Sequence, residues 1–251
     1  MKREKSDIAN EKDNVEVNFQ MQFDLGTGNI IGAKTKAIYK DAKKDVGYEG
    51  NGAKNADSLT MLDLCAIETV CIVQKAMIEK AKHTMPLYVP VSVGTIISPY
   101  NVYEIASMIK SFNLPNGSIN VVLINAECTS KADGVDKSLK HLISHDIKIY
   151  FGDIGTIALF VDLMCEIEPK GVIITKSQFS GATPGSRKYI ILKEIVSMCK
   201  RWELDIICDG IENALQAKLL FDLGCKKGVG DFYAKEVTLK EFEKNYFKLI
   251  W

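Results

Sequence analysis

The chain has 251 residues, 47% of them hydrophobic and 25% charged, which is typical of a globular protein with a sizeable buried core. Thirty-two basic and thirty-two acidic residues leave no net charge, so the basic surface of a nucleic-acid-binding protein is not expected. The sequence has no run of about 18 apolar residues, and its charged N-terminus lacks the apolar segment of a signal peptide. We therefore expect no membrane partner and a cytoplasmic location.

The seven cysteines are scattered and include no C-x-x-C pair. That spacing favours buried thiols in a reducing compartment over zinc ligands or a redox pair.

In chain order, residues 1–15 are predicted to be a disordered tail, because they carry too few apolar side chains to offset the entropy of ordering. Residues 16–251 are predicted to form one domain. The runs 19–24 and 29–39 flank Leu-Gly-Thr-Gly, which predicts a β-hairpin. The polar, glycine-rich stretch 40–57 is typical of a loop. Ser58 is the candidate N-cap of a following helix, whose apolar residues recur at helical spacing.

Five short β-rich runs follow, each separated from the next by an amphipathic segment of helix length: 86–93, 119–125, 147–151, 171–175 and 204–209. This alternation predicts parallel βαβ units. The number of strands slightly favours a closed (β/α)8 barrel over an open doubly wound sheet.

Several separated blocks lie at the predicted strand ends, where barrel proteins carry their working residues. They are GAKTKAIY (32–39), VPVSV (89–93), VVLINAE (121–127), IKIYFGDIGT (147–156), GVIITKSQF (171–179), IICDGIEN (206–213) and the closing stretch 220–243. Together they resemble the EAL domain family, which hydrolyses the bacterial messenger cyclic di-GMP. The resemblance implies a modified TIM-type barrel in which one early strand is antiparallel to the rest.

The resemblance also implies that metal-binding positions are replaced. Lys34 and Lys36 fall within the segment where the family has Glu-Ala-Leu, and Lys34 takes the place of the metal-binding Glu. The family's other metal-binding or catalytic positions correspond here to Pro90, Ile124, Gly152, Ile174 and Lys176, and its ligand-binding Arg and Gln to Ile38 and Val229. Asp153, Asp209 and Glu212 are the acidic residues retained at the site. An ammonium group offers no lone pair and repels a divalent ion, so we expect no metal, no cofactor and no enzymatic activity.

Three functions are compatible with this pattern. The first is a degenerate, inactive EAL-like module that regulates bacterial signalling by binding an unknown protein partner, with a homodimer also considered. The second is a metal-independent sensor of cyclic di-GMP or another phosphorylated ligand, bound by Lys34, Lys36 and Lys176 as point charges. The third is residual phosphodiesterase activity. Against ligand binding stands the alternative that these lysines pair with Asp153, Asp209 or Glu212 in a closed ionic network.

Other motifs have ordinary explanations. His141 and His145 are spaced as a helical pair but lack a third metal ligand. The loop 180–188 lacks the order of a P-loop, and the glycines near residue 28 fit a hairpin better than a dinucleotide fingerprint. Cys208 has no histidine implied nearby, so we expect a buried structural thiol.

Overall fold

A computed structural model describes residues 15–41, 44–46, 56–82, 84–124, 134–152 and 163–249. The strands are β1 (Val15–Asp24), β2 (Ile30–Asp41), β3 (Lys44–Val46), β4 (Leu87–Ser92), β5 (Ile119–Ile124), β6 (Lys148–Phe151), β7 (Gly171–Thr175), β8 (Asp205–Asp209), β9 (Lys227–Val229) and β10 (Val237–Thr238). The helices are α2 (Ala56–Ala81), α3 (Val93–Ile96), α4 (Pro99–Ser111), α5 (Val135–Ser144), α7 (Lys176–Phe179), α8 (Arg187–Arg201), α9 (Ala214–Asp222) and α10 (Leu239–Leu249).

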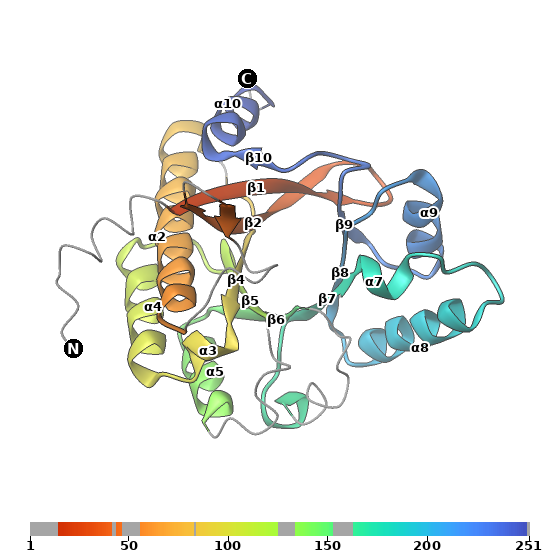
Figure 1. The fold of residues 1–251 in the computed structure, drawn as a ribbon, viewed down its shortest axis with the longest axis horizontal. Helices are drawn as coiled ribbons and strands as arrows, with labels where there is room; N and C mark the ends of the chain where they lie inside the picture. The colour runs from red at the N-terminus through yellow and green to blue at the C-terminus, as the bar shows by residue number, and fades with distance from the viewer. Residues whose placement is uncertain are drawn as a thin grey trace.

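Eight of these strands, β1, β2 and β4 to β9, close into a barrel within the described residues. The pairs from β2 and β4 round to β8 and β9 are all parallel. β1 closes the ring by pairing antiparallel with both β2 and β9. Helices cover the outside, with α2, α4 and α5 on one side and α7, α8 and α9 on the other (Figure 1). The predicted modified TIM-type barrel with one early antiparallel strand is therefore confirmed.

The β1–β2 hairpin is shaped by its turn residues. Asp24 Oδ1 accepts hydrogen bonds from the backbone nitrogens of Gly26 (3.0 Å) and Thr27 (2.7 Å), a local arrangement that short acidic side chains favour. The bond from the Thr27 backbone, with that from its hydroxyl, holds the pKa of Asp24 below its usual value. Gly28 has φ +72°, a conformation that costs glycine little. The predicted hairpin is thus confirmed, with β1 extending further toward the N-terminus than expected.

The strands separate two apolar cores. The larger lies between the sheet and the helices, and the smaller fills the barrel interior. The interior cluster consists of Tyr88, Val122, Tyr150, Ile173, Ile207 and Val229. Because successive side chains of a strand point to opposite faces, these residues identify which positions of each strand face inward.

Some local predictions need correction. α2 begins at Ala56, so Ser58 lies inside the helix instead of capping it. β2 runs to Asp41 and β3 pairs with it, so part of the expected 40–57 loop is a sheet edge. β1 starts at Val15, while residues 1–14 of the expected tail lie outside the described residues. Of the described cysteines, Cys165 is exposed, contrary to the expectation of buried thiols.

No described helix combines the length and apolar character needed to cross a bilayer.

Candidate functional site

The carboxyl ends of the parallel strands form the mouth of the barrel. Lys34 on β2 and Asp209 on β8 line the inner cavity there, together with Gln22, Tyr88, Ile173, Ile207 and Val229. By alternation from the interior residues Tyr88, Val122 and Tyr150, the next inward positions are Pro90 on β4, Ile124 on β5 and Gly152 directly after β6. These three residues therefore lie at the mouth end of the barrel interior, as predicted from the sequence.

Ile174 does not belong to this layer. Its side chain is fully buried in the core between the sheet and the helices, whereas its neighbour Ile173 faces the barrel interior. The block alignment placed Ile174 at a catalytic position, but the alternation of side chains along β7 turns it outward. Ile174 therefore packs the barrel against its helices.

Lys34 is held by Asp209. Its ammonium donates a hydrogen bond to Asp209 Oδ2 across 175 residues of chain. The two side chains are 30% and 17% exposed, so this pair is partly withdrawn from solvent at the top of the interior. The space beneath it is narrow, about 10 Å³, roughly what one water centre requires.

Gln22 on β1 lines the same narrow space. Its side chain is 1% exposed, and neither of its polar atoms has a hydrogen-bond partner among the described residues. A buried carboxamide without partners is unusual and costly. The upper interior therefore offers hydrogen-bonding capacity close to Lys34 and Asp209.

Lys176 is held by Glu212 in a more exposed pair. The distance from Lys176 Nζ to Glu212 Oε1 is 2.5 Å, and each side chain is 48% exposed. Lys176 is the first residue of α7, whose capping box is formed by Thr175 and Gln178. Its backbone packs against Gly210, since a Cβ atom added to Gly210 would lie 2.8 Å from that of Lys176. This contact fixes the position of Lys176 at the mouth of the barrel.

Of the six predicted site residues, the structure thus joins four in two ion pairs. Lys36 lies on the same face of β2 as Lys34 by alternation, opposite Asn18 in the register with β1, and is half-buried. Asp153 lies outside the described residues. The sequence left open that these lysines pair with the retained carboxylates in an ionic network. The structure shows such pairing, but as two separate ion pairs.

Sequence reasoning missed the polar lower end of the barrel interior. Tyr150 donates its hydroxyl to Asp205 Oδ2 (2.9 Å), and Lys227 Nζ donates to the same oxygen (3.0 Å). Tyr88 packs edge-on against Tyr150 with ring centroids 5.1 Å apart. Side chains that face the barrel interior recur at every second residue of a strand, so the sequence could have indicated these residues. Tyr150 and Lys227 lie two residues before an inward-facing position at the mouth, and Asp205 lies four residues before one.

The pKa values at the lower end reflect its burial. Burial raises the pKa of Tyr88 to about 12 and raises that of Tyr150 further. For Asp205, burial alone would raise the pKa, but the hydrogen bond and charge of Lys227 and the hydroxyl of Tyr150 outweigh it and lower the pKa. Asp205 is therefore a stabilised carboxylate.

The sequence model of the EAL domain covers residues 3–236 of this chain. The chain belongs to the EAL domain family.

Relatives and solved structures agree with this assignment. The signaling protein YkoW of Bacillus subtilis is 21% identical over 239 residues, covering 94% of this chain and 30% of that protein. The chain thus spans about a third of the length of the curated relatives it matches. The EAL domain protein of Listeria monocytogenes aligns with a TM-score of 0.79 at 15% identity over 98% of both chains. The PaMucR phosphodiesterase in complex with c-di-GMP aligns with a TM-score of 0.80 at 14% identity, over 91% of this chain and 99% of that one.

Membership of the EAL family contradicts the expectation that the chain is not an enzyme, because the neighbours of its fold include a protein named as a phosphodiesterase.

A divalent metal ion, which the EAL family implies, does not fit the described residues of the mouth. Asp209 already bonds the ammonium of Lys34, whose charge repels such an ion. Among the described residues, no three His, Cys, Asp or Glu side chains converge as metal ligands would. Because Asp153 is not described, the expected absence of a metal or other cofactor stays a prediction.

The remaining motifs of the EAL chain take ordinary structural places. Ser186 of the 180–188 loop caps α8 by accepting from the backbone nitrogen of Tyr189 (3.2 Å). Cys208 is fully buried, and its hydrogen bond with Cys225 together with burial raises the pKa of its thiol. His141 and His145 have ring centroids 4.5 Å apart, but His145 follows α5 instead of lying within it.

Proposed function

We propose that this EAL barrel binds cyclic di-GMP at its mouth and acts in cyclic di-GMP signalling. The observation that carries the proposal is the pair of lysines at the mouth, Lys34 and Lys176, each held by a carboxylate from the end of β8 or the turn after it. Structural neighbours support the ligand, since PaMucR and the Xanthomonas citri FimX EAL domain are named as complexes with it. A phosphate group carries a negative charge with which an ammonium group pairs.

The two lysines differ in how easily a phosphate could take over from the carboxylate. An exposed ion pair contributes roughly 0–1 kcal/mol, so Glu212 is easily exchanged for a ligand phosphate at Lys176. The Lys34–Asp209 pair is less exposed, so leaving Asp209 without its cation costs more free energy than leaving Glu212 without its cation. We therefore assign the first phosphate contact to Lys176, with Lys34 contributing its charge from below.

Isothermal titration calorimetry with cyclic di-GMP tests the proposal. The wild-type protein is titrated in the presence of a chelator and again with Mg²⁺, alongside Lys176→Met, Lys34→Met and the control Lys193→Met. Lys193 is an exposed lysine on α8, outside the mouth. We expect saturable binding that survives chelation and weakens by about tenfold or more in Lys176→Met, equivalent to roughly 1.4 kcal/mol.

A hydrolysis assay on the same samples measures whether bound cyclic di-GMP is turned over. Binding that appears only with Mg²⁺, or that is equal in all three variants, would contradict the role given to the lysines. No saturable heat under either condition would remove cyclic di-GMP as the ligand.

Regulation through a protein partner, a homodimer, a cytoplasmic location and the 16–251 domain boundary stay predictions. The described contacts assign no partner surface to the chain. If the barrel transmits its ligand state to another protein, that partner should bind differently with and without cyclic di-GMP.

A further inference from the structure

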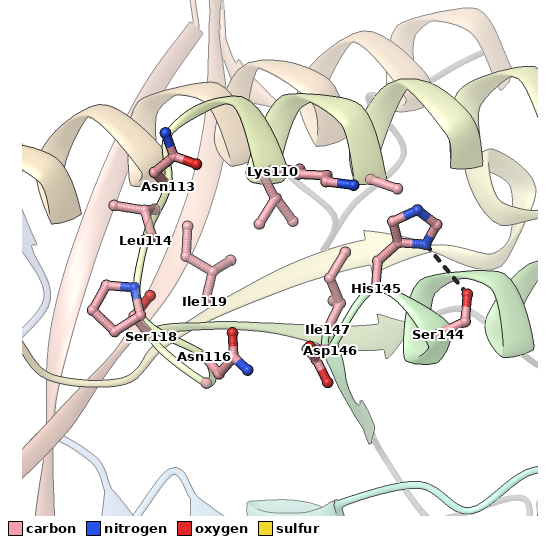
Figure 2. A pocket seen from close by; sticks show the side chains of 14 residues that line it. Lys110, Asn113, Leu114, Asn116, Ser118, Ile119, Ser144, His145, Asp146 and Ile147 are labelled. Carbon is pink, nitrogen blue, oxygen red and sulfur yellow. Dashed lines mark hydrogen bonds between the residues drawn. The ribbon is translucent and has the colours of Figure 1, made fainter.

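Two cavities of the described barrel differ in what lines them. The larger, about 370 Å³, lies between the α4–β5 and α5–β6 connections, where the charged lining side chains are Lys110 and Asp146, both exposed (Figure 2). These two charges are opposite, so they select no class of ligand. The smaller cavity, about 10 Å³, lies in the barrel interior beside the Lys34–Asp209 pair. We call it the inner cavity, and it contains a buried polar group without partners.

The inner cavity has the size of a single water site. The side chains of Tyr88, Ile173, Ile207 and Val229 line it, and all four are buried. Its volume of about 10 Å³ is roughly what the centre of one water needs, so a larger molecule does not fit. A water is retained at such a site only when polar groups face it, and three of the lining residues supply them: Gln22, Lys34 and Asp209.

The carboxamide of Gln22 has a place built for it in the barrel. The register of the hairpin sets Gln22 on β1 opposite Gly32 on β2. Gln22 Oε1 lies 2.7 Å from the position that a Cβ atom at Gly32 would take, so the glycine leaves the space that the carboxamide occupies. Gln22 is 1% exposed, and within the described residues neither Oε1 nor Nε2 has a hydrogen-bond partner. Because a buried donor and acceptor without partners are costly, this geometry indicates a bridging molecule.

The ion pair provides the other side of the bridge. Lys34 carries three N–H donors, and its hydrogen bond to Asp209 uses one of them. Neither Lys34 nor Asp209 is a hydrogen-bond partner of Gln22, although all three line the inner cavity. A water both donates and accepts, and buried waters typically make about three hydrogen bonds. The ammonium repels a cation and the carboxylate repels an anion, so a neutral molecule fits best between them.

We propose that the inner cavity binds one ordered water, which joins the carboxamide of Gln22 to the Lys34–Asp209 pair. Gln22 is then a positioning residue, because through this water it fixes the ammonium of Lys34 at the inner end of the mouth. The proposal does not depend on cyclic di-GMP binding at the mouth.

NMR of the full chain detects such a water directly. The two side-chain amide protons of Gln22 are assigned as the pair of signals that is missing from Gln22→Met. We expect these protons to show a nuclear Overhauser effect to water with the sign of the protein's own protons, which only a long-lived water gives. The wild-type protein is sufficient for this measurement, so it does not depend on the folding of a variant beyond the assignment. If the Gln22 amide protons show no contact with a long-lived water, the proposal is overturned.

The stability of Gln22→Met gives a second readout whose sign separates a bridged carboxamide from an unpartnered one. Methionine has a similar length and no strong hydrogen-bonding group. Loss of the bonds to water should raise the equilibrium constant for unfolding by about fivefold, as expected for one net hydrogen bond. A carboxamide without partners gives the opposite result, because its replacement by an apolar side chain removes a desolvation cost. Urea denaturation measures the constant, and a value unchanged or lowered in Gln22→Met overturns the proposal.

A double-mutant cycle tests the positioning role. Lys34→Met should raise the unfolding constant at least about threefold less in the Gln22→Met background than in the wild type, because the bridge is already lost. Lys176→Met is the matched control, since neither Lys176 nor its partner Glu212 lines the inner cavity. Its effect should be the same in both backgrounds. If the effects of Gln22→Met and Lys34→Met simply add, Gln22 contributes only packing and the proposal is overturned.

Discussion

The two ends of the barrel interior use the same chemistry, a lysine bonded to a carboxylate, in different surroundings. At the lower end Asp205 receives both Lys227 and the hydroxyl of Tyr150. At the mouth Glu212 receives Lys176, and both side chains are 48% exposed. The difference separates fixed from exchangeable pairs, because a carboxylate that accepts from two donors, one of them the buried Tyr150, loses more when one of them leaves than a more exposed carboxylate with one donor does.

The Lys176–Glu212 pair at the mouth therefore suits ligand exchange, and the cluster around Asp205 suits stability. The predictions below test this division between fixed and exchangeable carboxylates, beginning with Asp63 on α2, which belongs to neither end of the barrel interior.

Asp63 should show the largest effect, because it is a fully buried carboxylate beside the end of β4. It accepts from the backbone nitrogen of Ser92 (2.9 Å), from the Ser92 hydroxyl (2.8 Å) and from the Thr95 hydroxyl (2.5 Å). Asp63→Ala leaves the Ser92 backbone nitrogen buried without this acceptor and leaves the two hydroxyls only each other and Thr60 as partners. We therefore expect the free energy of unfolding to fall by about 3 kcal/mol. Urea denaturation measures this change.

Asp63→Asn should lose less, since its amide oxygen still accepts. The control Glu79→Ala, an exposed residue on the same helix, should stay within about 0.5 kcal/mol of wild type. Equal losses in Asp63→Ala and Glu79→Ala would show that the buried bonds contribute nothing.

Gly210→Ala should break the geometry of the mouth. Gly210 has φ +91°, and an added Cβ would lie 2.8 Å from that of Lys176. We expect backbone strain to lower the free energy of unfolding by about 1–2 kcal/mol, and the clash to lower it further. Urea denaturation measures this change. The affinity for cyclic di-GMP should also fall, because the start of α7 must shift.

Gly181→Ala is the matched control, since Gly181 has φ +74° with nothing within 4 Å of an added Cβ. It should show the strain without the loss of affinity. If Gly210→Ala binds cyclic di-GMP as tightly as Gly181→Ala does, the position of Lys176 does not matter for binding.

Tyr150→Phe tests the lower end of the barrel interior through the pH dependence of the free energy of unfolding. The pKa of Asp205 is lowered, with burial opposing and Lys227 and Tyr150 favouring the charged form. Its stabilising contribution is therefore present above the unfolded pKa near 4 and is lost as pH falls through the lower folded value. We expect Tyr150→Phe to cost about 1–2 kcal/mol at pH 7 and less below about pH 4.

Urea denaturation of both proteins from pH 7 to pH 3 measures this difference. A cost that is the same at every pH would assign the loss to the hydrogen bond between the side chains of Tyr150 and Tyr88, not to the carboxylate.

The sequence predicted the strands that are buried on both faces, because an apolar run such as residues 171–175 can only pack inside the barrel. It missed β3, whose sequence Lys-Asp-Val has no pattern and which exists by pairing with the end of β2. It misplaced the start of α2 because Asp57 and Ser58 are both acceptable near a helix start.

For the site, the predicted strand ends identified which residues lie at the mouth of the barrel, but not which residues pair with one another. Lys34 could pair with any retained carboxylate until the barrel brought Asp209 to it across 175 residues. Ile174 was assigned to the site because motif spacing does not fix which face of a strand a residue takes. The cavity of about 370 Å³ between the α4–β5 and α5–β6 connections was not predicted, since it is lined by two segments that are separated in the sequence.

The two mouth pairs themselves give the smallest predicted effect and the most direct test of exchangeability. Lys176→Met should change the free energy of unfolding by no more than about 0.5 kcal/mol, because Lys176 and Glu212 are both half-exposed. Lys34→Met should cost about 1 kcal/mol, because it leaves the 17% exposed side chain of Asp209 without its cation. Urea denaturation at low and high salt measures both, and the Lys176 effect should vanish at high salt. If instead Lys176→Met costs as much as Lys34→Met and resists salt, Glu212 holds its lysine too firmly for a phosphate to displace it.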